Sequence, residues 1–389
     1  MKTKIFSHGR QFVDQKDIKE VVNSLNSSFL TNGPYVKKFE EACKKKLNSK
    51  YAFSCNSGTS SIMLAFLAVD LKENDSIIMP AINFIASANI ARNLKAKVYF
   101  ADIDYNTGQM TPKNVVDCMK LNKIKKVKLI LTMYLGGYPR NINEFYNLKK
   151  KLKCILIEDA CHAFGGKYKH NNKTYKIGSC KHSDISTFSF HPLKTITTGE
   201  GGLITTNSKI FAKKISLYRS HGMVRKNSHW KYNVMLNGYN YRLSDVNSAL
   251  GYSQIKKIDE FINWRKKIFE LYKKEFKDLK FLKIIDKTQH TNPAFHLMII
   301  LVDFSKLKIN KDELFRILMK NNIYCQFHYI PIFKFKAFRN KKEQSYPNTK
   351  KYFMNAVSIP IYYKLKLNDV RDIANIIKKN LSNNLKVKI

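Results

Sequence analysis

A single lysine, Lys194, stands between an apolar stretch and a glycine-rich turn, and this placement suits covalent chemistry. Residues 185–190 alternate as a buried strand does, and Gly199, Gly201 and Gly202 follow the lysine. A lysine held away from water has a lowered pKa, and only a neutral amine forms a Schiff base with a carbonyl carbon. Since most lysines are solvated charges, Lys194 by itself favours a surface position, and only the other motifs of the chain reverse that interpretation.

Asp159 follows a second buried-strand pattern, residues 154–157. Ligands of open α/β sheets bind at the carboxyl ends of strands, and a buried carboxylate there is costly unless it is paired. Asp159 is therefore a candidate partner for a protonated ring nitrogen, or else a helix cap. Cys161 and His162 adjoin it, but no further ligands stand at zinc spacing, so we expect no metal.

A Gly/Ser/Thr turn, residues 56–61, separates a short predicted strand from the apolar helix that begins at residue 62. Gly58 and Thr59 place N–H groups and a hydroxyl at the start of that helix, which is typical of a phosphate site. An ordinary capped helix has the same pattern. Phe84 enters another helix, where it could lie on a planar ring or fill the core.

The elements that must position these residues alternate between strands and helices. This alternation predicts a large α/β domain, residues 1–250, with a mostly parallel sheet, followed by a smaller βαβ-like α/β domain, residues 251–389. The predicted strands are 51–54, 76–79, 97–101, 128–133, 154–157, 185–190, 203–205, 296–302, 323–328 and 357–360. The main predicted helices are 15–30 (apolar at Ile18, Val21, Val22 and Leu25), 36–47, 111–119, 142–152, 208–220, 257–276, 311–319 and 368–381.

The composition limits the function classes. Lys and Arg number 70 against 29 Asp and Glu, giving a formal charge of +41. The excess is spread along the chain without a nucleic-acid motif, so we expect an anionic small substrate rather than nucleic acid. Seven scattered cysteines without a C-x-x-C pair predict reduced thiols and a cytoplasmic location. No signal peptide and no apolar run of about 18 residues is visible, so we expect no membrane association.

Four motifs together resemble the DegT/DnrJ/EryC1/StrS family of sugar aminotransferases, which bind pyridoxal phosphate on a fold-type-I scaffold. In order they are Asn56-Ser57-Gly58-Thr59-Ser60, Glu158-Asp159-Ala160-Cys161-His162-Ala163, Ser189-Phe190-His191-Pro192-Leu193-Lys194 with Thr198-Gly199-Glu200-Gly201-Gly202, and Gly238-Tyr239-Asn240-Tyr241-Arg242-Leu243-Ser244-Asp245. The resemblance covers nearly the whole chain. It implies pyridoxal 5'-phosphate as cofactor and a homodimer with a shared active site.

The resemblance also implies residue roles. Lys194 would carry the cofactor covalently, Asp159 would face its ring nitrogen and His162 its 3-hydroxyl edge. The other implied contacts are phosphate binding by Gly58, Thr59 and Ser189, ring stacking by Phe84, a bond from Asn240 to the neighbouring subunit's phosphate, and substrate contacts by Arg242 and His328.

Some stretches, such as Gln326-Phe327-His328-Tyr329-Ile330-Pro331, are similar to the pseudaminic acid branch of this family. That branch transfers an amino group, with L-glutamate the expected donor, to C4 of a UDP-linked 4-keto-6-deoxy-N-acetylhexosamine. Three alternatives stay open: an aminotransferase for another nucleotide-linked keto sugar at C3 or C4, such as a perosamine-type enzyme, a 3-dehydratase, and a non-catalytic regulator. Dehydratases of this family carry histidine in place of the lysine, so Lys194 disfavours that alternative.

Overall fold

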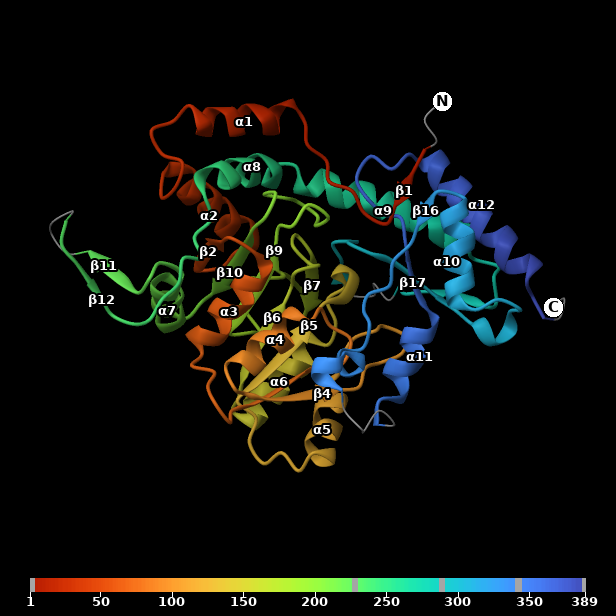
Figure 1. Ribbon diagram of the computed structural model, residues 1–389, viewed down its shortest axis with the longest axis horizontal. Helices are drawn as coiled ribbons and strands as arrows, with labels where there is room; N and C mark the ends of the chain where they lie inside the picture. The colour runs from red at the N-terminus through yellow and green to blue at the C-terminus, as the bar shows by residue number, and fades with distance from the viewer. Residues whose placement is uncertain (1–3, 226–229, 287–290, 340–344, 387–389) are drawn as a thin grey trace.

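A twisted sheet runs through the centre of the molecule (Figure 1). The computed structural model describes residues 4–225, 230–286, 291–339 and 345–386. Within them the central sheet has seven strands in the order β2-β10-β9-β6-β5-β3-β4, and β10 alone runs antiparallel to its neighbours. The mostly parallel sheet is thus confirmed. The strands are β2 Tyr51–Cys55, β3 Ser76–Pro80, β4 Lys97–Ala101, β5 Leu129–Met133, β6 Ile155–Asp159, β9 Ile185–Ser189 and β10 Gly202–Thr206.

Helices cover both faces of this sheet because its strands are apolar on both sides. Ile77, Leu129 and Leu131 pack under one helical layer, while Ile78, Ile130 and Leu156 pack under the other. The first layer contains α3 Gly58–Ala68, α4 Ala86–Asn93 and α7 Lys209–Arg219. The second contains α5 Pro112–Leu121 and α6 Ile142–Leu152, and α2 Pro34–Leu47, α8 Asp245–Ile255 and α9 Ile258–Glu275 join a further apolar cluster.

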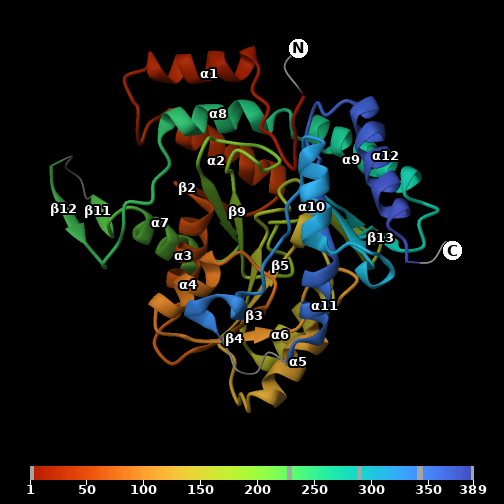
Figure 2. The same ribbon diagram turned by 45° about the vertical axis from the view of Figure 1, so that its right-hand side comes forward.

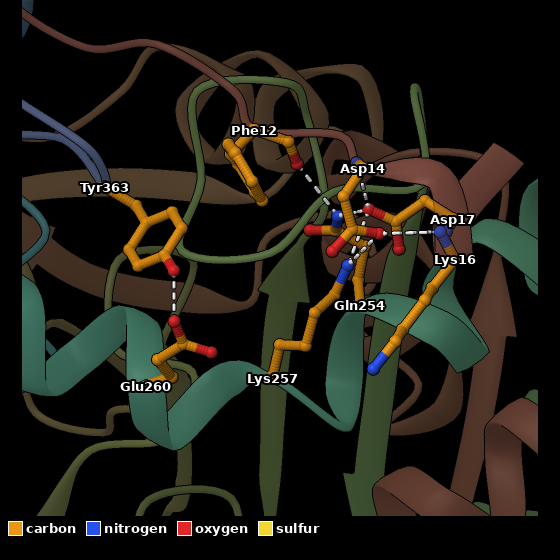
Figure 3. A network of polar contacts seen from close by, with 8 residues as sticks. All are labelled: Phe12, Asp14, Lys16, Asp17, Gln254, Lys257, Glu260 and Tyr363. Carbon is orange, nitrogen blue, oxygen red and sulfur yellow. Dashed lines mark hydrogen bonds and ion pairs between the residues drawn. The ribbon is translucent and has the colours of Figure 1, made fainter.

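Helix α1, Gln15–Leu25, is held on α8 and α9 by polar contacts (Figure 3). Lys257 Nζ lies 2.9 Å from Asp14 Oδ1 and 2.7 Å from Asp17 Oδ2. Gln254 Nε2 donates to the same Asp17 oxygen at 2.7 Å and to the Phe12 carbonyl at 2.9 Å. Asp17 is fully buried, and paired donors are what a buried carboxylate requires.

The apolar stripe predicted for this helix faces outward, which the pattern alone did not show. Ile18, Val22 and Leu25 are 47%, 45% and 54% exposed, while Asp17 and Ser24 are buried. Phe29 and Leu30, just after the helix, are also about half exposed. The helix ends at Leu25 rather than at residue 30. Exposed apolar patches are often found where proteins contact a partner.

The C-terminal part differs from the βαβ-like arrangement expected. Its strands β13 Leu282–Ile284, β15 Met298–Val302 and β17 Ala356–Ile359 form an antiparallel sheet, because β15 pairs with β13 and β17 in opposite directions. The strand predicted over 323–328 is only β16 Ile323–Tyr324, which pairs in parallel with β1 Phe6–Ser7 from the N-terminus. The helices there are α10 Lys311–Lys320, α11 Pro347–Asn355 and α12 Leu367–Asn383. The proposed division into domains at residue 250 stays a prediction.

Smaller strands complete the fold. Strands β7 Lys167–His170, β8 Lys173–Lys176 and β14 Thr291–Asn292 form a separate sheet. Strands β11 Met223–Arg225 and β12 Tyr232–Val234 form an arm that projects from the body in both views (Figures 1 and 2). No helix among the described residues is long and apolar enough to cross a membrane.

A buried carboxylate joins α8 to the start of α2. Asp245 is fully buried and accepts hydrogen bonds from the N–H groups of Gly33 at 2.6 Å and Tyr35 at 2.8 Å. These N–H groups begin α2 and have no acceptor within the helix, so the carboxylate caps the helix from a distant element. This contact fixes the turn that precedes α2.

We predict that Asp245→Ala lowers the free energy of unfolding by about 2–4 kcal/mol, because it leaves buried N–H groups without acceptors. The midpoint of urea unfolding, followed by circular dichroism, measures this loss. Asp259→Ala is the matched control, since Asp259 pairs with Lys46 at 2.6 Å but is 68% exposed. It should cost less than about 1 kcal/mol. Equal midpoints for the two variants would contradict the capping role.

Candidate active site

The predicted site residues meet at one edge of the central sheet. Strands β2, β3, β5, β6 and β9 run in the same direction, so their carboxyl ends share an edge. Gly58 follows β2, Phe84 follows β3, Asp159 ends β6 and Lys194 follows β9. This edge is where an open α/β sheet binds its ligand.

A cavity of about 410 Å³ lies at this edge. Eight of the ten predicted site residues line it: Gly58, Thr59, Phe84, Asp159, His162, Ser189, Lys194 and His328. The structure therefore brings together residues that are up to 270 positions apart in the sequence (from 58 to 328). Their individual roles remain predictions.

The start of α3 forms an anion cradle in this cavity. Ser57 caps the helix by accepting from Ser60 N–H at 3.0 Å, which leaves the N–H groups of Gly58 and Thr59 without an acceptor inside the helix. A side chain at Gly58 would bring its Cβ within 2.6 Å of Ser189 Cβ, so only glycine lets α3 approach β9 this closely. The start of α3, with Thr59, and Ser189 thus line the same part of the chain's cavity, and free N–H groups at a helix start suit a phosphate group.

Asp159 and Lys194 face the same cavity and influence each other's ionisation. Burial raises the pKa of Asp159, while the N–H of Cys161, which donates to Asp159 Oδ1 at 3.1 Å, and the charge of Lys194 oppose that rise. Burial lowers the pKa of Lys194, and the charges of Cys161 and Asp159 raise it by a smaller amount. A lysine with a lowered pKa has the neutral amine that attack on a carbonyl carbon requires.

Four imidazoles and a phenol line the other wall. His162 lies with its ring centroid 4.4 Å from that of His296 and 6.2 Å from that of His328, and the His8 ring lies 5.8 Å from His328. Tyr329 Oη lies 2.9 Å from His162 Nε2. Burial lowers the pKa of each of these histidines, to about 3 for His328, so this wall is uncharged at neutral pH.

Sequence reasoning missed three of these wall residues: His8, His296 and Tyr329. His8 arrives through the pairing of β1 with β16, and its carbonyl accepts from Ile361 N–H at 3.2 Å. His296 is held where its N–H donates to the Gly136 carbonyl at 2.9 Å. Such contacts between distant segments leave no local pattern. Tyr329 had a signal, because it adjoins His328 in the stretch used for the resemblance.

Two predicted residues lie outside this cavity lining. Asn240 is exposed, forms an isolated bridge with Ser220 and lies at the base of the β11–β12 arm. Arg242 Nη1 donates to Ser220 Oγ at 3.5 Å, and its buried Nε has no hydrogen-bond partner. Neither residue is part of this cavity lining, and the contact of Asn240 with the cofactor of a neighbouring subunit stays a prediction. Within the described ranges, no group of three His, Cys, Asp or Glu is placed to hold a metal.

The residues at this edge fit pyridoxal phosphate. The cradle that a Cβ at Gly58 would fill suits a phosphate, and Asp159 is an acceptor for a protonated ring nitrogen. Lys194 would supply an amine for the carbonyl carbon, and Phe84, 52% exposed, would offer an aromatic face. The cavity thus offers a group suited to each part of this one cofactor: its phosphate, its ring nitrogen, its carbonyl carbon and its ring face.

Comparison with known proteins agrees with this geometry. The DegT/DnrJ/EryC1/StrS aminotransferase family matches residues 11–378. UDP-4-amino-4,6-dideoxy-N-acetyl-beta-L-altrosamine transaminase of Campylobacter jejuni subsp. jejuni serotype O:23/36 (strain 81-176) is 36% identical over 368 residues, 94% of this chain and 95% of that protein. GDP-perosamine synthase of Escherichia coli O157:H7 is 29% identical over 349 residues, 89% and 91% of the two chains.

A solved structure is similar over the whole chain. Helicobacter pylori PseC, an aminotransferase involved in the biosynthesis of pseudoaminic acid, superposes with a TM-score of 0.89 at 29% identity, covering 98% of this chain and all of that one. The predicted family, fold class and cofactor are confirmed. The chain belongs to the DegT/DnrJ/EryC1/StrS aminotransferase family and is a pyridoxal-phosphate-dependent sugar aminotransferase.

Proposed function

We propose that this enzyme transfers an amino group from an amino acid, L-glutamate, to the C4 ketone of a UDP-linked 4-keto-6-deoxy-N-acetylhexosamine. The main observation in support of amino transfer is that Lys194, Asp159 and the start of α3 line the same cavity. The C4 position and the uridine nucleotide are supported by the 36% identity to the altrosamine transaminase. The likeness to GDP-perosamine synthase favours a GDP-linked 4-keto sugar as the second candidate.

The proposed roles of the residues are supported by their positions in the cavity. Pyridoxal phosphate, when bound, withdraws electrons from the carbon that loses or gains the amino group. Gly58, Thr59 and Ser189 hold its phosphate, and Phe84 covers a ring face. Asp159 keeps the ring nitrogen protonated, because a buried carboxylate stabilises a paired positive charge. Lys194, released as a neutral amine, moves a proton at the reacting carbon.

The uncharged imidazole wall suits a sugar better than an ion. Neutral imidazoles each offer one donor and one acceptor, which matches hydroxyl groups. His328 faces this cavity with Nδ1 bonded to Ser358 Oγ at 2.9 Å, and its other nitrogen is the group we propose for a sugar contact. The negative diphosphate is drawn instead by the net positive charge of the chain. Arg242 remains a proposed substrate contact, although it lies outside this cavity lining.

We also propose a homodimer in which Asn240 reaches the cofactor phosphate in the neighbouring subunit. Asn240 lies at the base of an arm whose exposed apolar side chains include Tyr232, Val234 and Met235. The outward stripe of α1 provides a second apolar surface on the same chain. Because exposed apolar surface is costly in water, burial against a second copy is favourable. All seven cysteines are free thiols, which suits a cytoplasmic enzyme.

The substrate proposal is tested by visible absorbance followed by product analysis. The purified enzyme with pyridoxal phosphate should absorb in the visible range and lose that band on addition of L-glutamate, as expected for transfer of the amino group to the cofactor. UDP-linked 4-keto-6-deoxy-N-acetylhexosamine should then restore the band and yield a 4-amino sugar, identified by mass spectrometry and NMR. Restoration only by a GDP-linked 4-keto sugar would overturn the proposed substrate and favour the second candidate.

Asp159→Asn should lower the rate of the half-reaction with L-glutamate by about 100-fold or more, since a neutral amide does not hold the ring nitrogen protonated. Single-turnover absorbance at saturating cofactor measures this rate. Asp259→Asn, an exposed carboxylate, is the control and should keep the parent rate. A rate within threefold of the parent in Asp159→Asn would remove Asp159 from the mechanism.

Asn240→Ala should weaken cofactor retention by about tenfold, because it removes a hydrogen bond to a charged phosphate. Asn233→Ala, in the same arm, is the control. Mixing Asn240→Ala subunits with Lys194→Ala subunits should restore one intact site in each mixed dimer. Retention that mixing does not restore would contradict a site shared between subunits.

A further inference from the structure

A hydrogen bond joins the central sheet to the C-terminal part at the wall of the cavity. His162 follows β6, Tyr329 follows β16, and Tyr329 Oη lies 2.9 Å from His162 Nε2. The roles proposed above assign nothing to Tyr329. Its ring lies 4.9 Å from that of His328 and 5.9 Å from that of Phe84, measured between centroids, so it stands among the residues that surround the cofactor.

The second nitrogen of His162 fixes the direction of this bond. The N–H of Gly136 donates to His162 Nδ1 at 3.3 Å, so Nδ1 carries a lone pair. Burial lowers the pKa of His162 well below its usual value, and Lys194 and His328 act in the same direction. The neutral ring therefore carries its proton on Nε2, which donates to the Tyr329 oxygen.

This direction leaves the Tyr329 proton for another acceptor. An oxygen that accepts from His162 has its own O–H available, and Tyr329 lines the cavity. Accepting one hydrogen bond also polarises the O–H and makes it a better donor. The Tyr329 hydroxyl is thus a hydrogen-bond donor whose position is fixed by His162, and His162 is itself held by the backbone N–H of Gly136.

The cofactor offers one matching acceptor. Pyridoxal phosphate carries a hydroxyl oxygen on its ring, here called the ring oxygen. This oxygen is bonded to the ring carbon next to the one that bears the aldehyde carbon, and the ring nitrogen lies across the ring from the aldehyde-bearing carbon. With Asp159 assigned to the nitrogen and Lys194 to the carbon, the ring oxygen is the remaining polar group of the ring for the wall that carries His162 and Tyr329.

We propose that Tyr329, oriented by His162, donates a hydrogen bond to the ring oxygen of pyridoxal phosphate. This proposal rests on the proposed function, because it uses the ring orientation assigned there. The donor draws negative charge on the ring oxygen toward itself. It thereby loosens the hold of that oxygen on the proton carried by the nitrogen that links Lys194 to the cofactor.

The sign of the resulting pH effect follows from this competition. Without the Tyr329 hydroxyl, the ring oxygen keeps more negative charge and holds the proton at the linking nitrogen more tightly. The pH at which the resting enzyme's visible band is half lost therefore rises. The other titratable groups that line the cavity with this pair are unaltered by the substitution: His8, Asp159, Cys161, His191, Lys194, Glu200, His296 and His328.

Tyr329→Phe should move this midpoint up by about one pH unit, the size expected for one hydrogen bond to a charged oxygen. Absorbance titration of the resting enzyme, with no substrate present, measures the midpoint. Tyr352→Phe is the matched control: Tyr352 is buried and donates to the His328 carbonyl at 3.0 Å, so it loses a hydroxyl beside the same segment. Its midpoint should equal that of the parent.

A double variant tests whether His162 orients the donor. His162→Phe keeps a ring but removes the donor to Tyr329, so the further change Tyr329→Phe should shift the midpoint less in this background than in the parent. A normal visible band with an unchanged midpoint in Tyr329→Phe would overturn the proposal while leaving the cofactor site intact. Absence of a band in the parent enzyme would instead overturn the proposed ring orientation and function together.

Discussion

Burial of Asp159 and Lys194 at the carboxyl edge of the sheet is the constraint on which the site depends. Each group loses hydration there, and burial shifts the pKa of each toward its neutral form, upward for the acid and downward for the amine. Such groups are tolerated because a charged ligand can complete their pairing. The apolar strands and helices on both faces keep water away, and so make this pair chemically useful.

The sheet direction converts distant sequence positions into one site. Strands β2, β6 and β9 run in the same direction. Strand β10 lies between β2 and β9 and runs in the opposite direction, so the carboxyl ends of the other strands still share one edge. Glycine at position 58 allows α3 to approach Ser189, which brings the phosphate cradle beside the lysine. The C-terminal part then closes the cavity with His296, His328 and Tyr329, and the N-terminal strand adds His8. The residues proposed to hold the cofactor thus lie at the sheet edge, whereas the proposed sugar contact lies on this added wall.

Surface features that have no use in a single chain fit an assembly. The stripe of α1 and the projecting arm expose apolar side chains, and Asn240 lies outside the cavity lining of its own chain. Polar contacts among Asp14, Asp17, Gln254 and Lys257 hold α1 so that its polar side is buried and its apolar side is presented. Helix α1 thus exposes its apolar side and buries its polar side, and contact with the proposed second copy would explain this orientation.

In the sequence by itself, alternation and glycine-rich turns predicted the α/β sheet and the placement of Lys194 and Asp159 after buried strands, because these are local patterns. The family and the cofactor were implied by the resemblance of four motifs. Eight of the ten site residues that the resemblance implied line one cavity. Only the tertiary structure decided that α1 turns its apolar stripe outward and that the C-terminal strands pair antiparallel. It also placed His8, His296 and Tyr329 beside His162. These features depend on contacts between distant segments, which local periodicity does not encode.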